Sequence, residues 1–521
     1  MKRLILLSIL AASLQACQVN KTEDSDKEEV ANLSYSEKYR PQYHFSPEAH
    51  WMNDPNGLVF NKGIYHLFYQ YYPEDIKWGP MHWGHATSKN LKDWQNKPVA
   101  LYPDSLGYIF SGSAVVDLKN SSGFGTTDNP PLVAMFTYHN AEGEKAGDLN
   151  YQTQGIAHST DNGDTWTKYK GNPVIANTDN QKDFRDPKLF WHEASQKWIL
   201  VLVAGDHANI YNSTNLKDWQ YLSDFGNDRG AHGGVWECPD LFELKANNGE
   251  SRWVLFISIN PGAPNGGSGT QYFIGDFDGK TFTSDQKEEK WLDLGRDNYA
   301  GITFNNLPED ERTFIGWMSN WDYGQQTPTE KWRSSMTLPR KLELFKDSTN
   351  YYVSNYPVEQ ITKDLNYFSP EQKDKQKLVF TDSLLQQSNL KFELPKPLAD
   401  FKIIYSNSQG DSLKINYNKA ENHFYLDRSK AGVDDFSDAF AQTIMQAPAH
   451  FKDDNTAEIS IFTDQSSIEF FADGGSTVLT AQIFPHIPYN TFTIISNDEP
   501  KSIKLAHISS IWNKPNNQTI N

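Results

Sequence analysis

The stretch Trp51-Met52-Asn53-Asp54-Pro55-Asn56-Gly57 introduces a pattern that the chain repeats twice more. In each copy an acidic residue precedes a short apolar strand, a polar turn and a second strand rich in aromatic and β-branched residues. The other two acids are Asp186, in Phe184-Arg185-Asp186-Pro187-Lys188, and Glu237, in Trp236-Glu237-Cys238-Pro239-Asp240. Three carboxyl groups therefore have equivalent positions in a repeated unit.

The repeated unit predicts the architecture of the first two thirds of the chain. Including two weaker copies, the units start near residues 54, 111, 186, 238 and 300. Each unit holds about four short strands, which is the content of one propeller blade. We therefore predict an all-β fold that begins with a five-bladed β-propeller over residues 41–345. The first strand of a blade lines the central channel, so the three acids are expected to converge there despite their distance in sequence.

The rest of the chain shows a different β pattern. Apolar and polar residues alternate over Leu413–Tyr417, Ala457–Phe462 and Ser467–Phe471, as in half-buried strands. Asp473-Gly474-Gly475 is typical of a hairpin turn. We predict a C-terminal β-sandwich over residues 351–521.

Composition excludes some functions. The 521 residues carry a formal net charge of -18 without a strongly basic run, so nucleic acid would be repelled. Aromatic residues make up 13% of the chain, with 15 Trp, which suits both a β-rich core and stacking against sugars. The two cysteines, Cys17 and Cys238, cannot form a disulfide framework. We expect a neutral or weakly charged substrate.

The first residues resemble an export signal. Two basic residues precede an apolar run over residues 4–14, which is too short for a mature membrane span but suits a signal peptide. Leu14-Gln15-Ala16-Cys17 resembles a lipobox, in which Cys17 is lipidated. We expect residues 1–17 to be a lipoprotein signal peptide and residues 18–40 a disordered, largely acidic tether. The expected location is the outer membrane or cell surface of a Gram-negative bacterium, with membrane contact only through the lipid anchor.

The three acids allow two chemistries besides a plain turn, which Asn53–Gly57 alone would favour. Clustered carboxyl groups repel one another and are tolerated mainly where a metal or a reaction needs them. Calcium usually takes several oxygens from one loop, and Arg185 beside Asp186 disfavours a metal ligand. Glycoside hydrolysis instead needs two carboxyl groups in opposite protonation states. We expect no metal and no cofactor.

Neighbouring residues suggest which acid carries the proton. Apolar surroundings favour the protonated form of a carboxyl group. Glu237, flanked by Trp236, Cys238 and Pro239, is therefore the candidate proton donor. Asp54, between polar neighbours, is the candidate ionised partner.

Four blocks resemble, in order, the signature blocks of glycoside hydrolase family 32, the fructan hydrolases and invertases. They are Trp51–Gly57, Phe110-Ser111-Gly112-Ser113, Arg185-Asp186-Pro187 and Glu237-Cys238-Pro239, within a match over about residues 43–339. The resemblance implies a propeller, a β-sandwich and retention of configuration through a covalent fructosyl intermediate. The implied roles are Asp54 as nucleophile, Glu237 as general acid/base, and Asp186 as the residue that binds fructose hydroxyls and stabilises the transition state.

The same resemblance implies contacts with the fructosyl unit. Amides and hydroxyls can satisfy sugar hydroxyls, while Trp and Phe offer apolar walls. Taken alone, Trp78 or Trp317 could equally be a core residue. The implied contacts are Asn53, Gln70, Trp78, Phe110, Ser111, Ser113, Arg185 and Trp317.

We therefore predict a β-fructosidase that releases terminal fructose from fructans or fructo-oligosaccharides, with levan, inulin and sucrose as candidate substrates. The block Trp78–His85 looks closer to levanases and exo-inulinases than to cytoplasmic sucrose-phosphate hydrolases. Endo action, fructosyl transfer and a non-catalytic surface glycan-binding lipoprotein stay open. So does an inverting mechanism, which would separate the carboxyl groups by about 6.5–9.5 Å instead of about 5–5.5 Å.

Overall fold

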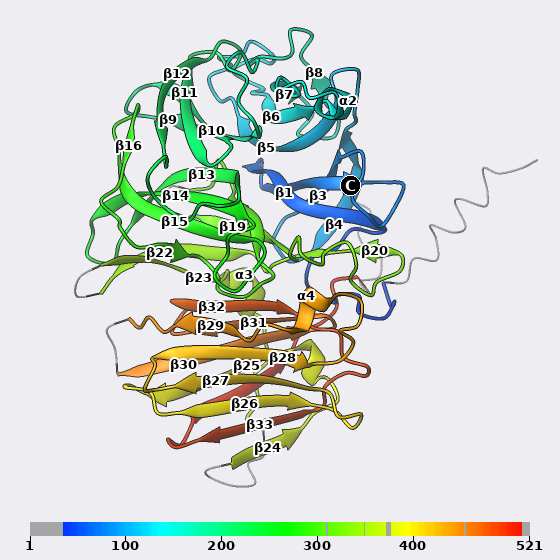
Figure 1. The fold of residues 1–521 in the computed structure, drawn as a ribbon, viewed down its shortest axis with the longest axis vertical. Coiled ribbons are helices and arrows are strands. Elements are labelled where there is room, and N and C mark those ends of the chain that lie inside the picture. The colour runs from blue at the N-terminus through cyan, green and yellow to red at the C-terminus, as the bar shows by residue number, and fades with distance from the viewer. Residues whose placement is uncertain (1–34, 309–310, 348–349, 371–376, 453–454, 513–521) are drawn as a thin grey trace, which may run out of the picture. The chain divides into compact units, whose positions relative to one another are not determined.

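The structure, a computed structural model, describes residues 35–308, 311–347, 350–370, 377–452 and 455–512. Nearly all regular structure in these residues is antiparallel β-sheet (Figure 1). The helices are short: α2 (Ala141–Lys145), α3 (Glu359–Thr362), α4 (Asp438–Ala441) and the 3-10 helix η1 (Leu385–Gln387). In this part of the chain no helix has the length and apolar character needed to cross a membrane.

Five sheets form the blades of the propeller, drawn from blue to green in Figure 1. The first contains β1 (His50–Asn61), β2 (Ile64–Tyr72), β3 (His82–Ser88), β4 (Trp94–Leu101) and, parallel to β1, β20 (Trp332–Arg333). The second contains β5 (Tyr108–Val116), β6 (Leu132–His139), β7 (Gln152–Ser159) and β8 (Thr167–Lys168). The third contains β9 (Phe184–His192), β10 (Lys197–Ala204), β11 (His207–Ser213) and β12 (Gln220–Phe225). The fourth contains β13 (Val235–Lys245), β14 (Ser251–Asn260), β15 (Gly269–Phe277), β16 (Phe282–Thr283) and β17 (Lys290–Trp291). The fifth contains β18 (Tyr299–Thr303), β19 (Thr313–Met318), β21 (Ser335–Met336), β22 (Arg340–Lys346) and β23 (Tyr351–Pro357).

The first strands of the five blades close a ring around the channel. β1 contacts β5, β5 contacts β9, β9 contacts β13, β13 contacts β18, and β18 returns to β1. These inner strands are mostly buried, because each has a neighbouring inner strand on either side. The ring brings residues from distant parts of the sequence to one axis, as the repeats predicted.

Two further sheets pack into the β-sandwich. One contains β24 (Lys377–Thr381), β33 (Thr491–Ser496), β26 (Phe401–Ser406), β27 (Ser412–Asn418), β28 (His423–Lys430) and β29 (Met445–Pro448). The other contains β32 (Thr477–Gln482), β31 (Ser467–Ala472), β30 (Thr456–Asp464), β25 (Ser388–Pro395) and β34 (Lys501–His507). Alternate residues of β27 enter the core between the sheets, as the period-2 pattern predicted. The predicted fold, a five-bladed propeller followed by a β-sandwich, is confirmed.

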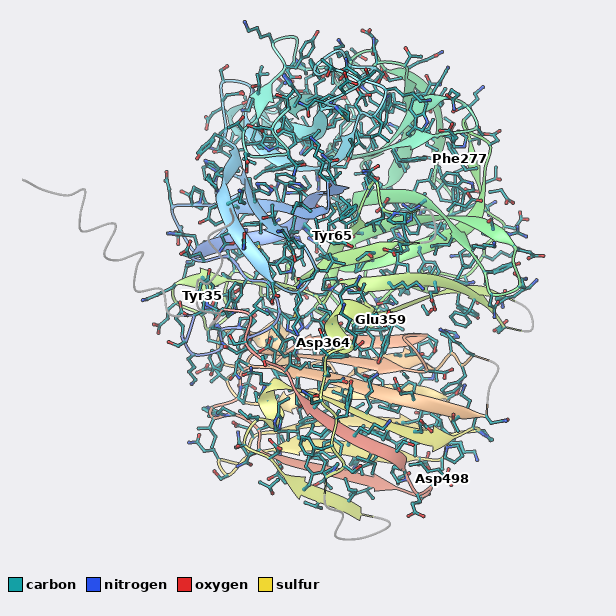
Figure 2. All side chains as sticks on the ribbon, turned by 180° about the vertical axis from the view of Figure 1, so that it is seen from behind. Tyr35, Tyr65, Phe277, Glu359, Asp364 and Asp498 are labelled. Carbon is teal, nitrogen blue, oxygen red and sulfur yellow. The ribbon has the colours of Figure 1, made fainter. Side chains whose placement is uncertain are left out.

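Buried charges join the propeller to the sandwich. The guanidinium of Arg340 donates to Asp293 Oδ2 at 2.9 Å and to Glu469 Oε2 at 2.9 Å, and all three side chains are almost fully buried. His44 lies between Asp464, at 2.8 Å, and Glu469, at 3.0 Å. Figure 2 shows the connecting segment near α3, marked by Glu359 and Asp364, between the two sets of strands. Because buried charges need partners, this network holds the sandwich in one position on the propeller.

The structure concerns two of the predicted domain boundaries, the end of the tether and the end of the propeller. Residues 1–34, which include Cys17, the predicted signal peptide and most of the predicted tether, lie outside the described residues. Tyr39 and Arg40, which the sequence assigned to that tether, are buried instead, since Arg40 donates to the carbonyl oxygens of Pro47 and Glu48 at 2.7 and 3.0 Å. β23 pairs along its whole length with β22. We therefore propose that the propeller extends to Pro357 rather than to residue 345.

Candidate active site

All five inner strands are irregular close to their first residues. Register shifts lie between Met52 and Pro55, Ile109 and Gly112, Arg185 and Lys188, Glu237 and Asp240, and Tyr299 and Ile302. A β-bulge bends a strand and re-aims its side chains, and bulges are common beside active sites. The five bulges therefore turn the start of each blade toward the mouth of the channel.

Proline follows the bulged residue in three of these strands. Pro55, Pro187 and Pro239 have no backbone N–H to place in a ladder, so a bulge suits them. Asp186 and Cys238 also have left-handed backbone angles, with φ of 64° and 45°. Such angles are strained for residues other than glycine and occur mainly at functional sites.

Asp54 is held by two side-chain donors. Ser111 Oγ donates to Asp54 Oδ2 at 2.7 Å, and Asn53 Nδ2 donates to Asp54 Oδ1 at 3.0 Å. Asn53 is itself fixed, because its Oδ1 accepts a hydrogen bond from Trp51 Nε1 at 2.7 Å. The carboxylate of Asp54 is therefore oriented by residues from two blades.

Asp186 and Glu237 lie beside Asp54. The backbone N–H of Cys238 donates to Asp186 Oδ2 at 3.0 Å. The thiol of Cys238 reaches both aspartates, with Sγ 3.7 Å from Asp54 Oδ2 and 3.6 Å from Asp186 Oδ2. Glu237 accepts from Arg185 Nη2 at 2.9 Å and from the hydroxyl of Tyr299. The three acids that the repeats singled out are thus brought together.

The environment of Glu237 differs from the one that its sequence neighbours predicted. Successive side chains of a strand point to opposite faces, so Trp236 turns away and donates to Ala231 O at 2.9 Å. The carboxyl group contacts a guanidinium and a phenol instead of apolar groups. A role as proton donor cannot therefore be argued from apolar surroundings.

Burial and repulsion between neighbouring carboxylates raise the pKa values of Asp54 and Asp186. Burial raises the pKa of Asp54, and the nearby Glu237 raises it further. The hydrogen bonds from Ser111 and Asn53 act in the opposite direction. Burial also raises the pKa of Asp186, to about 7, although the adjacent Arg185 lowers it. Arg185 compensates only in part because its Nε lies 3.9 Å from Asp186, while its terminal nitrogens pair with Asp183 and Glu237.

Four of the other predicted contact residues lie around this cluster. Gln70, on β2, donates to Ile109 O at 3.1 Å. Phe110 stacks on His139, with ring centroids 4.2 Å apart and planes 5° apart. Trp78, 38% exposed, meets Phe110 edge to face at 6.1 Å. Together with Ser111 they place amide, hydroxyl and aromatic groups near the carboxylates, as a sugar site needs.

Two predicted contact residues, Ser113 and Trp317, instead contact other parts of the protein. The hydroxyl of Ser113 donates to Pro187 O at 2.8 Å and accepts from Leu189 N at 3.0 Å, so it joins two blades. Trp317 has no exposed surface and packs against Trp51 and Trp321, at centroid distances of 6.0 and 4.9 Å. Direct contact of either side chain with a sugar would require these contacts to open.

Sequence reasoning missed three residues of the site: Tyr299, Asp183 and His139. Tyr299 starts the fifth inner strand, and that position alone pointed to the channel mouth. Asp183 accepts from Arg185 Nη1 at 2.7 Å and precedes the quoted block by two residues. His139, at the end of β6, had no motif to mark it.

A propeller channel whose mouth gathers three carboxyl groups beside exposed aromatic rings has the features of a glycoside hydrolase site. The model of the glycosyl hydrolases family 32 N-terminal domain matches residues 44–357, and that of the family 32 C-terminal domain matches residues 358–512. The chain therefore belongs to glycosyl hydrolase family 32 and is a glycoside hydrolase.

Individual relatives agree with this assignment. A levanase of Bacillus subtilis (strain 168) is 46% identical over 501 residues, which cover 92% of this chain and 72% of the relative. An extracellular exo-inulinase of Aspergillus niger is 40% identical, covering 92% of this chain and 96% of the relative. The crystal structure of an exo-inulinase from Aspergillus awamori superposes with a TM-score of 0.82 at 37% identity, covering 92% of this chain and all of that one. A β-fructofuranosidase from Schwanniomyces occidentalis gives 0.81 at 33% identity, covering 92% and 99%.

Proposed function

We propose that the protein is a retaining β-fructosidase that hydrolyses terminal β-D-fructofuranosyl linkages of levan or inulin, and of sucrose as a smaller substrate. The observation that carries this proposal is the cluster of three acids at the channel mouth, with Asp54 and Asp186 buried and Glu237 half-buried. Family membership and relatives that are a levanase and exo-inulinases supply the substrate class.

Asp54 is the proposed nucleophile. Its Oδ2 accepts from Ser111 and its Oδ1 from Asn53, so the carboxylate is held in one orientation before substrate arrives. Attack on the anomeric carbon of the fructosyl unit forms a covalent ester as the leaving oxygen departs. Water then attacks the same carbon and releases fructose with its configuration retained.

Glu237 is the proposed general acid and base. It gives a proton to the leaving oxygen in the first step and takes one from water in the second. Arg185 and Tyr299 fix its two oxygens, one each. Asp186, held by the backbone of Cys238, is proposed to accept hydrogen bonds from fructose hydroxyls.

Paired substitutions test these roles. Asp54→Asn keeps the shape of the side chain and is expected to lower kcat/KM by about 10⁴-fold or more, as removal of a nucleophile does. Glu237→Gln is expected to cost about 10²- to 10⁴-fold on natural substrates and less on substrates with good leaving groups. Ser113→Ala, in the same region, is the matched control. Unchanged turnover in both acid variants would refute the proposal.

A time course of products tests the position of cleavage. Exo action, by analogy with the exo-inulinases, predicts fructose alone from the first minutes of digestion of levan and inulin. A ladder of oligosaccharides would instead indicate an endo enzyme.

We also propose that the protein acts outside the cell, anchored by a lipid on Cys17. The signal-like sequence before Cys17 and the extracellular exo-inulinase relative support this location. A fatty-acid probe should label the full chain and fail to label Cys17→Ala. Equal labelling of both would reject the anchor.

A further inference from the structure

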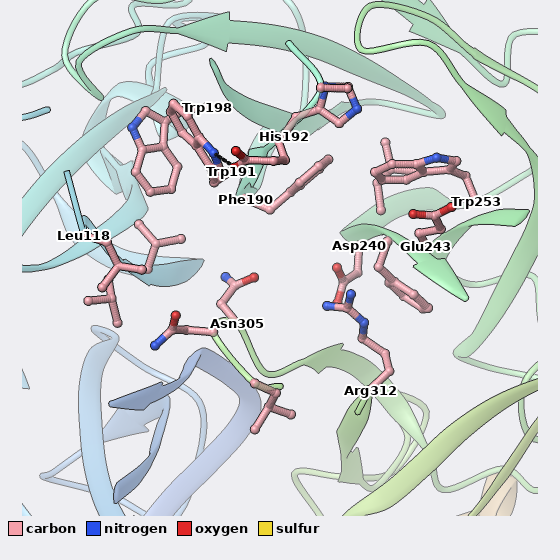
Figure 3. Close-up of a pocket in the computed structure, with 18 of the residues that line it drawn as sticks. Leu118, Phe190, Trp191, His192, Trp198, Asp240, Glu243, Trp253, Asn305 and Arg312 are labelled. Carbon is pink, nitrogen blue, oxygen red and sulfur yellow. Dashed lines mark hydrogen bonds between the residues drawn. The ribbon is translucent and has the colours of Figure 1, made fainter. Parts of the chain in front are cut away.

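A cavity of about 780 Å³ lies at the end of the propeller channel opposite the three acids (Figure 3). Its walls come from the far ends of the inner strands and the turns after them, at Val116, Phe190, Phe242 and Asn305. Because a strand rises about 3.3 Å per residue, Phe190 is roughly 13 Å along β9 from Asp186. The volume is in the range of sites that bind small molecules.

A buried ion pair separates this cavity from the active site. Lys188 Nζ lies 3.0 Å from Asp240 Oδ2 and donates to Thr303 O at 2.6 Å. Both charged side chains are almost fully buried, and both belong to inner strands between the acids and the cavity. A ligand in the cavity would therefore be bound separately from the substrate at Asp54.

Aromatic rings form one side of the cavity. Phe190 and Trp253 lie with their centroids 5.7 Å apart, and Trp191 and Trp198 with theirs 5.2 Å apart. Trp191 and Trp253 are partly exposed, and Figure 3 shows both rings at the cavity wall. Large aromatic faces of this kind suit the apolar C–H surfaces of sugar rings.

Charged side chains, Asp240, Glu243 and Arg312, form the other side. The guanidinium of Arg312 makes no hydrogen bond or ion pair with the described residues, and it lies 5.4 Å from the ring of Phe242. Asp240 Oδ1 is buried and also lacks a partner there. Burial lowers the pKa of Arg312, and the nearby Asp240 and Glu243 oppose that effect. Arg312 is half-buried and lines the cavity together with the exposed Glu243, so its guanidinium can donate to a ligand there and the Glu243 carboxylate can accept from one.

The charges select the kind of ligand. An anion at Arg312 would be repelled by Asp240 and Glu243, whereas a cation would be repelled by Arg312. A hydroxyl group can accept from the guanidinium and donate to a carboxylate at once. We propose that this cavity is a second carbohydrate-binding site, which takes a neutral oligosaccharide such as a segment of the fructan chain. That the sugar is a fructan rests on the proposed function.

Calorimetry on the full chain tests the second site. In the Asp54→Asn background, which should bind substrate without turning it over, titration with inulin-derived oligosaccharides is expected to show two binding events. Adding Trp253→Ala, or separately Arg312→Met, should weaken one of them by about tenfold or more and leave the other unchanged. Tyr221→Ala, which removes an exposed ring on the outer strand β12, should keep both events.

A single binding event, or two events that Trp253→Ala and Arg312→Met leave unchanged, would overturn the proposal. If either variant fails to fold, as thermal unfolding would show, the exposed Glu243→Gln replaces it, with the same loss expected. Competition by inorganic phosphate at the second event would contradict a neutral ligand. Hydrolysis by the unmodified enzyme is measured separately, so absence of activity with two binding events would reject the proposed function and not this site.

Discussion

Replacing Ser111 with alanine is expected to weaken the proposed nucleophile without removing it. Ser111 Oγ donates to Asp54 Oδ2 at 2.7 Å, and Asp54 is only 9% exposed. Hydrogen bonds to charged groups contribute about 1.5–3 kcal/mol. If that energy orients the carboxylate in the transition state, its loss corresponds to about 10- to 100-fold in kcat/KM.

The pH profile of kcat/KM gives the sharper readout. The hydrogen bond from Ser111 favours the ionised carboxylate and lowers the pKa of Asp54, so its removal raises that pKa. The acidic limb of the profile should therefore move to higher pH in Ser111→Ala. Ser113→Ala is the matched control on the same strand, because its hydroxyl contacts Pro187 and Leu189 rather than Asp54. An acidic limb that stays in place, or that moves equally in both variants, would refute the reasoning.

Three further outcomes are expected. Tyr299→Phe, which removes a donor to Glu237, should lower kcat/KM by about tenfold, more on natural than on activated substrates; equal losses would contradict its role at the leaving group. Burial lowers the pKa of His44, but hydrogen bonds to Asp464 and Glu469 raise it overall to about 9. Its stabilising contribution of about 3 kcal/mol should be complete below pH 6.5 and disappear as the pH rises through 9, and denaturant unfolding of His44→Gln should lack this dependence. Arg340→Met leaves the buried Asp293 without its ion-pair partner and leaves Glu469 only His44, and it should lower the free energy of unfolding by about 3–5 kcal/mol; an unchanged denaturation midpoint would contradict the importance of the buried network.

The sequence predicted the fold because the repeats and the strand period both depend on local chemistry. Each blade has its own apolar strands and turn, so the starts near 54, 111, 186, 238 and 300 lie within a few residues of the starts of β1, β5, β9, β13 and β18. The alternation over residues 413–417 likewise predicted β27. The sequence did not mark the end of the fifth blade, because pairing of β23 with β22 follows from the sheet and not from an alternating pattern in β23.

The sequence predicted the position of the three acids better than the direction of their neighbouring side chains, and the reason is physical. Asp54, Asp186 and Glu237 converge because they start inner strands. A shift of one residue moves a side chain to the other face of a strand, and bulges make such shifts at every blade. Ser111, beside the bulge, reaches Asp54, whereas Ser113 is turned to the next blade. No feature of a single sequence marks these shifts, apart from the prolines that accompany three of them.

Side-chain direction also explains the contacts that the sequence missed. Arg185 is next to Asp186 in the sequence, but its terminal nitrogens reach Asp183 and Glu237. Tyr299 lies 62 positions from Glu237 in sequence and meets it only through the ring of blades. Contacts of this kind depend on the closed propeller and not on local pattern.

The most direct test of the central claim, nucleophilic attack by Asp54 followed by water, is the configuration of a trapped product. Methanol added during hydrolysis competes with water for the fructosyl intermediate, and the methyl fructofuranoside formed is stable enough to be assigned by NMR. Two displacements at the same carbon predict the methyl β-D-fructofuranoside alone. Formation of the α anomer by the enzyme would show a single displacement and contradict the account.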